Sequence, residues 1–363
     1  MYLLSVSAMC SLPTGRQAAL RRACKADLDS LETSSGHSWM LRLPLSVLVL
    51  LTSVWLLMGC SLLGTEDDPP WDTDIPESED FNAQAPVWTS DGESIFFLHT
   101  QEGNDANPGR LNQLWKVDIA SGEREQIAPG RMTTPDLSPD GAWVVFHSRA
   151  QFSHLYKLHL ERDSLVALTG PGSPNPDLDA TTVARWHPDG ERILYARSAG
   201  EPRGLSKMNA DGTDAHIFIP YGVQGDWFPD GERVVYVNWD QNEETQHRRQ
   251  QIYVADVDGS NARKLTNLPN SDVVAPRVSP DGTQIAFAYG AQQGPRDLYL
   301  MDADGSNLQQ ITGGRGSDRR ADWHPSGEKI VFERVFRANY QQTRYSYVLD
   351  LETLEVEPVF PAN

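Results

Sequence analysis

A pattern of apolar and polar positions recurs six times along the chain. Each copy contains an apolar residue, usually Trp, then a short polar turn that is usually Pro-Asp-Gly, then a run of apolar residues. The copies occupy residues 87–97, 136–146, 185–195, 226–236, 277–287 and 322–332. Pro-Asp-Gly supplies a preset φ, an Asx hydrogen bond and a position with positive φ, which predicts a tight hairpin turn. Apolar runs such as Ile193-Leu194-Tyr195 are continuous rather than alternating, which predicts strands buried on both faces.

A second pattern follows each hairpin. It is clearest at residues 251–256, followed by Asp258-Gly259, and at residues 297–302, followed by Asp304-Gly305. These segments predict a third strand, a turn and a short outer strand. The copies are about 40 to 50 residues apart, which is the length of a four-stranded propeller blade. We therefore predict an all-β fold, a six-bladed β-propeller with four antiparallel strands per blade, over residues 83–363.

The combined repeat resembles that of the TolB-like propellers, in which P-x-W-S-P-D-G is followed by D-I-Y-V-M-D-A-D-G-S-N and L-T. The resemblance covers about residues 83–361. It implies the fold more firmly than a function, because TolB-like propellers also occur in prolyl-oligopeptidase-type peptidases and some polysaccharide lyases. TolB itself contacts a peptidoglycan-associated lipoprotein through its propeller and other Tol proteins through an N-terminal α/β domain. Here a short acidic segment stands in place of that domain, so we expect a lipoprotein form without it.

An uncharged apolar run at residues 43–58 precedes Gly59-Cys60 and is typical of a signal peptide. The motif ending in Cys60 resembles the lipobox of bacterial lipoproteins, which implies lipid attachment to that sulfur. Because a signal peptide normally has a short basic start, we predict that residues 1–39 are a non-native extension and that residues 40–59 are the signal peptide. The alternative is an uncleaved membrane anchor. In both cases we expect the body in the cell envelope, at the periplasmic face of a membrane or on the outer membrane.

Charge excludes one class of partner. The chain has 31 Lys and Arg against 50 Asp and Glu, for a net charge of -19, so it repels nucleic acid. Residues 60–82 are acidic and proline-rich, which predicts an extended tether. No cysteine follows Cys60, so the propeller has neither a disulfide nor a thiolate metal site.

Three features of the sequence bear on metal binding and catalysis, and none predicts either. The Asp-x-Asp-Gly segments at 256–259 and 302–305 place glycine too early for an EF-hand calcium loop, so we interpret them as turns. His187 and His324 occupy the same turn in opposite blades, too far apart for one metal ion. No G-x-S-x-G motif of a serine hydrolase occurs. We predict no metal, no cofactor and no enzymatic activity.

A charged residue precedes the apolar residue in five of the six predicted innermost strands, and the hypothesis concerns four of these five residues. We hypothesise that Arg185, Asp226, Arg277 and Asp322 lie near the central channel and pair across adjacent blades, with their charged tips within about 8 Å. The alternative is that they point into solvent between loops.

The longest predicted loops, residues 238–250 and 334–342, lie on the face opposite the Pro-Asp-Gly turns. Binding residues concentrate on loops that a rigid scaffold presents. The candidate partner-binding residues on this face are Trp239, Arg248, Arg249, Arg315, Arg319, Arg320, Arg337 and Tyr340. A positive patch on an acidic body predicts an acidic partner. The alternative is scattered, solvated charges.

The sequence therefore predicts a non-enzymatic, monomeric, membrane-tethered interaction propeller that binds an envelope protein or an acidic glycan. The alternative is a carbohydrate-binding or polysaccharide-lyase-like propeller that acts on an acidic glycan through its channel. A compact cluster of His, Arg and carboxylate groups in the channel mouth would favour that alternative. A broad patch carried on loops would favour a protein partner.

Overall fold

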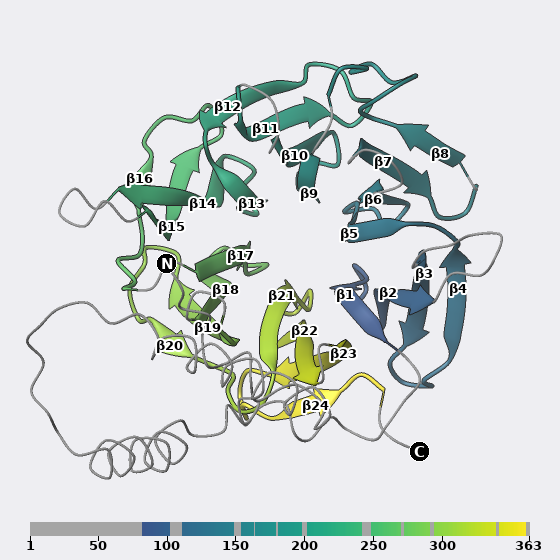
Figure 1. The fold of residues 1–363 in the computed structure, drawn as a ribbon, viewed down its shortest axis with the longest axis vertical. Helices are drawn as coiled ribbons and strands as arrows, with labels where there is room; N and C mark the ends of the chain where they lie inside the picture. The colour runs from purple at the N-terminus through teal and green to yellow at the C-terminus, as the bar shows by residue number, and fades with distance from the viewer. Residues whose placement is uncertain are drawn as a thin grey trace, which may run out of the picture. The chain divides into compact units, whose positions relative to one another are not determined.

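The strands of the protein form six separate four-stranded sheets, each built from one continuous stretch of chain. The computed structural model describes residues 82–101, 111–148, 154–162, 164–178, 181–197, 202–241, 248–269, 272–290, 294–338 and 341–360. Within these ranges 24 strands pair in antiparallel fashion, and the sheets are arranged as blades around a common centre (Figure 1). The prediction of an all-β, six-bladed propeller with four antiparallel strands per blade is confirmed. The predicted extension, signal peptide, Cys60 and most of the tether lie outside the described residues.

Each blade uses its first strand as the innermost one (Figure 1). Blade one contains β1 (Ala83–Trp88), β2 (Ser94–Gln101), β3 (Leu111–Asp118) and β4 (Arg124–Ala128). Blade two contains β5 (Met132–Leu137), β6 (Trp143–Ser148), β7 (His154–His159) and β8 (Ser164–Ala167). Blade three contains β9 (Thr181–Trp186), β10 (Arg192–Arg197), β11 (Gly204–Asn209) and β12 (His216–Pro220).

The second half of the ring repeats this order. Blade four contains β13 (Val223–Trp227), β14 (Arg233–Gln241), β15 (Arg248–Asp256) and β16 (Arg263–Lys264). Blade five contains β17 (Asp272–Val278), β18 (Gln284–Gly290), β19 (Arg296–Asp302) and β20 (Gln309–Gln310). Blade six contains β21 (Ser317–Trp323), β22 (Lys329–Ala338), β23 (Gln341–Asp350) and β24 (Val356–Pro358). No helix among the described residues has the length and apolar character needed to cross a membrane.

The core consists of apolar clusters between neighbouring blades. One cluster packs Val145 of β6 against Trp186, Ile193 and Tyr195 of blade three, all of them buried. Every member of the six clusters lies between Ala83 and Phe360. The propeller therefore carries its own core and can fold as an independent unit.

Side-chain packing closes the ring between blade six and blade one. The rings of Phe97 and Phe360 are 5.0 Å apart, and the Arg124 guanidinium lies 4.5 Å from the Phe360 ring. The Ser346 hydroxyl donates a hydrogen bond to the Ala83 carbonyl at 3.3 Å. Within the described residues no strand is exchanged between these two blades, so closure depends on lateral contacts.

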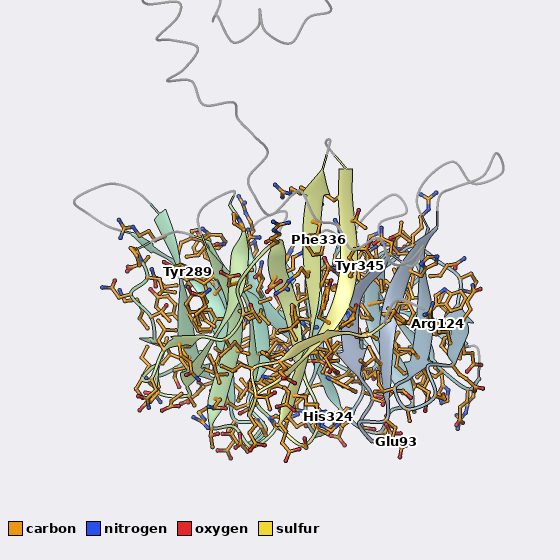
Figure 2. The ribbon with its side chains drawn as sticks, turned by 90° about the horizontal axis from the view of Figure 1, so that it is seen from below. Glu93, Arg124, Tyr289, His324, Phe336 and Tyr345 are labelled. Carbon is orange, nitrogen blue, oxygen red and sulfur yellow. The ribbon has the colours of Figure 1, made fainter. Side chains whose placement is uncertain are left out.

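The propeller has two unlike faces. The turns between the first and second strands and between the third and fourth strands define the turn face, where Glu93 and His324 lie (Figure 2). The hairpins between the second and third strands and the connections between blades define the hairpin face, where the β22–β23 ribbon projects (Figure 2).

The two longest predicted loops are instead mostly strand. β14 and β15 remain paired as far as Gln241 and Arg248, and β22 and β23 as far as Ala338 and Gln341. The prediction of loops over 238–250 and 334–342 is therefore wrong in extent. An unbroken antiparallel register satisfies the backbone of these polar segments, which therefore form projecting two-stranded ribbons.

Each innermost strand contains one β-bulge. The register of each first pair of strands shifts at a residue other than glycine with a left-handed φ between 41° and 55°. These six residues are Ala85, Thr134, Val183, Gln224, Ala275 and Arg320. A bulge leaves one residue out of the strand ladder, so its backbone groups need partners elsewhere.

Candidate binding site

Five charged side chains from the innermost strands meet at the centre of the propeller. The channel ring comprises Asp136, Arg185, Asp226, Arg277 and Asp322, whose side chains are each 8 to 13% exposed. Arg185 lies 3.5 Å from Asp136 and 4.0 Å from Asp226. Arg277 lies 3.5 Å from both Asp136 and Asp226 and forms an ion pair with Asp322. The structure thus brings the four predicted channel residues within ion-pairing distance and adds Asp136 to them.

Backbone hydrogen bonds fix the carboxylates of the channel ring. Asp322 accepts the N–H of Trp88 at 2.8 Å, and Asp136 accepts that of Trp186 at 2.8 Å. Burial raises the pKa of Asp136 and Asp322 against the opposing effect of the neighbouring guanidinium groups. Because the ring groups bind one another and the backbone of the next blade, the ring braces the blades.

The channel ring does not contain the cluster expected of a glycan-cleaving enzyme. Arginine and carboxylate groups are present, but among the described residues no histidine hydrogen-bonds to the ring or pairs with it. The described residues also contain no group of three His, Cys, Asp or Glu side chains arranged to hold a metal ion.

His187 and His324 connect blades on the turn face. His187 contacts the Gly231 carbonyl of blade four through Nε2 at 3.0 Å, and His324 contacts the Gly92 carbonyl of blade one at 3.2 Å. Both glycines have positive φ, and a Cβ on either would lie within 2.6 Å of the histidine ring. The two histidines therefore act as separate packing residues in blades three and six.

The eight predicted partner-binding residues have different environments. Trp239 is 39% exposed on β14, Arg337 is exposed on β22, and Arg315 is exposed before β21. Arg249 is half-buried on β15. The side chain of Arg248 and the whole of Tyr340 lie outside the described residues.

Arg319 and Arg320 are not the loop residues that the sequence predicts. They belong to β21, and together with Arg344 they surround Glu333, which is 0% exposed; we call these four residues the Glu333 cluster. The distances to the Glu333 carboxylate are 2.8 Å from Arg319, 3.3 Å from Arg320 and 3.9 Å from Arg344. The Ala85 N–H donates to the same carboxylate at 2.9 Å.

Glu333 remains ionised at neutral pH. Burial opposes its ionisation, but the guanidinium groups of Arg320, Arg319 and Arg344 and the Ala85 N–H hold its pKa below the usual value. The cluster therefore combines three guanidinium groups with one carboxylate and keeps a positive excess near the hairpin face.

A polar pocket of about 270 Å³ lies beside this cluster, where blades six, one and two meet. Its lining residues come from the hairpin-face ends of several strands and are Asn82, Gln84, Thr100, Asn112, Arg131, Thr133, Gln342 and Arg344. Among the described residues that line it, all eight are polar, two are cationic and none is acidic. Such a pocket favours an anionic ligand.

Hydrogen bonds between its own side chains hold the pocket in shape. Arg344 donates to Gln84 and, at 3.2 Å, to Gln342. The Thr100 hydroxyl donates to Asn112 at 3.1 Å, and Asn112 donates to the Met132 carbonyl at 3.0 Å. The site is therefore preorganised, which lowers the entropy cost of binding.

Sequence reasoning missed this pocket because its residues lie at opposite ends of the chain. Asn82 and Gln342 become neighbours only when the ring closes. One signal was present in the repeats, since Glu333 occupies a position that is apolar in blades one, three, four and five. A charged residue at a buried repeat position indicates a local cluster of charges.

The turn face has the opposite charge. The six turns between first and second strands, residues 89–93, 138–142, 187–191, 228–232, 279–283 and 324–328, hold nine Asp and Glu and no Lys or Arg. Hydrogen bonds from neighbouring hydroxyl and backbone groups hold the pKa of Asp91, Asp140 and Asp281 below the usual value. The turn face therefore repels an acidic partner at neutral pH.

Comparison with known proteins agrees with this architecture. The family model of the TolB beta propeller domain matches residues 220–341, which cover blades four and five and the first two strands of blade six. The uncharacterized protein Atu1656 of Agrobacterium fabrum is 26% identical over 272 residues, or 70% of this chain and 85% of that protein.

Solved structures show the same fold. TolB from Acinetobacter baumannii has a TM-score of 0.55 at 18% identity, over 68% of this chain and 58% of its own. This chain thus spans little more than half of that TolB. The putative TolB from Agrobacterium tumefaciens has a TM-score of 0.54 at 22% identity, over 67% of this chain and 86% of its own. The tricorn protease has a TM-score of 0.57 at 19% identity, over 78% of this chain and 26% of its own.

One of these structures bears the name of a protease, so the shared fold does not by itself decide between binding and catalysis. The sequence repeats, the six four-stranded blades, the family match and the structural relatives nevertheless agree on architecture. This chain is a six-bladed β-propeller, and its residues 220–341 match the family model of the TolB beta propeller domain.

Proposed function

We propose that this protein is a non-enzymatic interaction scaffold of the bacterial envelope, anchored by a lipid at Cys60, whose hairpin face binds an acidic protein partner. The apolar run before Cys60 supports export and anchoring. The tether would then allow the propeller to reach partners near the membrane surface.

The observation that carries the proposal is a difference in charge between the two faces. The turn face presents carboxylates from every blade, whereas the hairpin face presents Arg131, Arg315 and Arg337 beside the positive Glu333 cluster. In a chain with a net charge of -19, this arrangement orients an approaching acidic surface toward the hairpin face.

The channel supports binding rather than catalysis. The charged groups of its ring are engaged in ion pairs between blades. General acid or base catalysis needs a group that is free to exchange a proton with a substrate. A braced ring favours a rigid platform instead.

A charge-reversal pull-down tests the proposal. Residues 61–363 are immobilised and exposed to bacterial envelope extract, as the unaltered chain and as a double variant with Arg131→Glu and Arg337→Glu on the hairpin face. We expect the unaltered chain to retain a protein partner. The double variant should retain at least tenfold less of that partner. The matched control is Arg162→Glu with Lys329→Glu, which changes net charge equally at two exposed positions of the turn face.

Equal retention by both double variants would contradict the proposed face. Failure of the unaltered chain to retain any protein would contradict the scaffold function itself. Thermal melting of each variant confirms that the compared chains are folded.

A further inference from the structure

We propose that the polar pocket between blades six, one and two is a recognition site for a carboxylate group whose carrier also donates a hydrogen bond. This inference deepens the proposed function, because the pocket lies on the face to which we assign partner binding. It names the chemical group that the face recognises.

The pocket is rich in donors because three of its four amide oxygens already accept hydrogen bonds. Gln84 Oε1 and Gln342 Oε1 both accept from Arg344, and Asn112 Oδ1 accepts from Thr100. Few side-chain acceptors are thus left for a ligand, while the Arg131 guanidinium offers donors. A planar carboxylate matches the fork of an arginine with two parallel hydrogen bonds.

One positive charge in the pocket has no ion-pair partner among the described residues. Arg131 is half-buried and pairs with no carboxylate of the described residues. On the other side of the pocket, Arg319, Arg320 and Arg344 lie within ion-pairing distance of the Glu333 carboxylate. Nη2 of Arg319 is buried and makes no hydrogen bond within the described structure. An anionic ligand would pair with Arg131 in a partly desolvated site, where ion pairing is strong.

One acceptor in the pocket needs a donor from the ligand. Asn82 lines the pocket, and its buried Oδ1 has no hydrogen-bond partner in the described structure. A buried acceptor without a partner costs about 1 to 3 kcal/mol. A ligand that carries an N–H or O–H beside its carboxylate would satisfy both requirements, as does an amino acid or an acidic residue within a peptide.

The size of the pocket limits the ligand. A volume of about 270 Å³ is slightly below the range of about 300 to 1,000 Å³ for pockets that hold drug-sized molecules. It therefore suits a single amino acid or one acidic side chain with its backbone. Free and peptide-borne carboxylates share this chemistry, so the test uses both.

The chain itself supplies a natural acidic probe. Residues 66–80 contain eight Asp and Glu and no Lys or Arg, and they end two residues before Asn82. A tethered segment competes at a high effective concentration. Binding is therefore measured on residues 81–363, from which this segment is removed and which retain the whole apolar core.

The experiment is an NMR titration that follows the side-chain amides of Asn82 and Asn112. The probes are L-glutamate, its carboxylate-free diamide, and a synthetic peptide of residues 66–80. We expect a carboxylate probe to shift these signals saturably, with the diamide at least tenfold weaker than L-glutamate where the free amino acid binds. Arg131→Gln should weaken binding at least tenfold, whereas Arg162→Gln, which removes an exposed cation of the turn face, should leave it unchanged.

The outcomes decide two questions: whether the pocket binds a carboxylate, and whether a small molecule or a polypeptide carries it. Saturable binding of L-glutamate supports a small-molecule source, and binding of the peptide alone supports a polypeptide source. If neither probe binds, or if folded Arg131→Gln binds as well as the unaltered propeller, the pocket is not a carboxylate site. Retention of a protein partner on the hairpin face would still stand in that case, because the pull-down measures it separately.

Discussion

At the scale of single residues, buried polar groups replace apolar ones where blades must be joined. Glu333 stands in β22 at the repeat position that blade three fills with Ala196 and blade five with Ala288. A buried charge is tolerated only when it is paired and hydrogen-bonded. Three guanidinium groups and the Ala85 N–H of the next blade provide those partners for Glu333.

Glu333→Gln should destabilise the propeller by about 3 to 5 kcal/mol at pH 7, because it leaves three arginines without their carboxylate. The folded-state pKa of Glu333 is depressed, so its contribution is present above the unfolded pKa and is lost as pH falls through the folded one. The stability gap between the two proteins should therefore narrow on acidification below the usual pKa. Urea unfolding at pH 7 and at lower pH measures the gap, and a gap independent of pH would contradict the assignment.

Gly231→Ala should also destabilise the propeller. Its φ is +69°, and the added Cβ would lie 2.6 Å from the His187 ring, so both strain and collision contribute, by about 1 to 3 kcal/mol together. Blades two and five have serine at the position of His187. In a His187→Ser background the collision therefore disappears and only the backbone strain remains. A double-mutant cycle of thermal stability measures the difference, and strict additivity would show that the histidine does not pack on this turn.

At the scale of elements, the blades alternate in how they join. The bulge N–H of each odd-numbered blade receives an acceptor from the blade before it. His147 binds Val183 N at 3.2 Å, Gln224 binds Ala275 N at 2.7 Å, and Glu333 binds Ala85 N at 2.9 Å.

The aspartates of the channel ring follow the same alternation. Asp136, Asp226 and Asp322 each accept a backbone N–H of the following odd-numbered blade. The closing contact between blades six and one is therefore the same kind of joint as those between blades two and three and between blades four and five.

Arg277→Met should destabilise the propeller by about 3 to 5 kcal/mol, because this side chain contacts Asp136, Asp226 and Asp322 from three blades. Adding Asp322→Asn should recover part of the loss, since one uncompensated carboxylate is removed. Denaturant unfolding of the two variants tests this. If Asp322→Asn lowers the free energy of unfolding of the Arg277→Met protein as much as it lowers that of the unaltered protein, the ring does not act as a network.

The sequence predicts the strands and blades more completely than it predicts the binding site. The Pro-Asp-Gly turns and apolar runs define the hairpins locally, so blade number and strand order follow from the repeats. The ends of the two ribbons, near Trp239 and Arg337, are predicted as loops because their residues are polar, but the strands remain paired there. The pocket depends on ring closure and on contacts between distant segments, which local patterns do not encode.

At the scale of the whole molecule, the propeller separates charge between its faces. The short turns carry Asp because its side chain stabilises tight turns through hydrogen bonds to neighbouring backbone and hydroxyl groups, as Asp281 does with Thr283. The hairpin face lacks these Asp-containing tight turns between first and second strands and carries exposed cations such as Arg337. The Asp residues of the tight turns thus contribute to the difference in charge between the two faces.

This polarity should make association depend strongly on salt. Raising the ionic strength from about 0.05 M to about 0.5 M should weaken retention of an acidic partner at least tenfold, because screening shortens the Debye length. A salt series in the pull-down measures the effect. Retention that does not change with salt would indicate an apolar contact instead.

Site-specific photo-crosslinking tests the central claim, partner binding at the hairpin face, most directly. A photoreactive residue is placed at Gln342 at the rim of the polar pocket and, in a second protein, at exposed Ser326 on the turn face. We predict a crosslinked partner from position 342 and none from position 326. Crosslinking from position 326 alone would contradict the account.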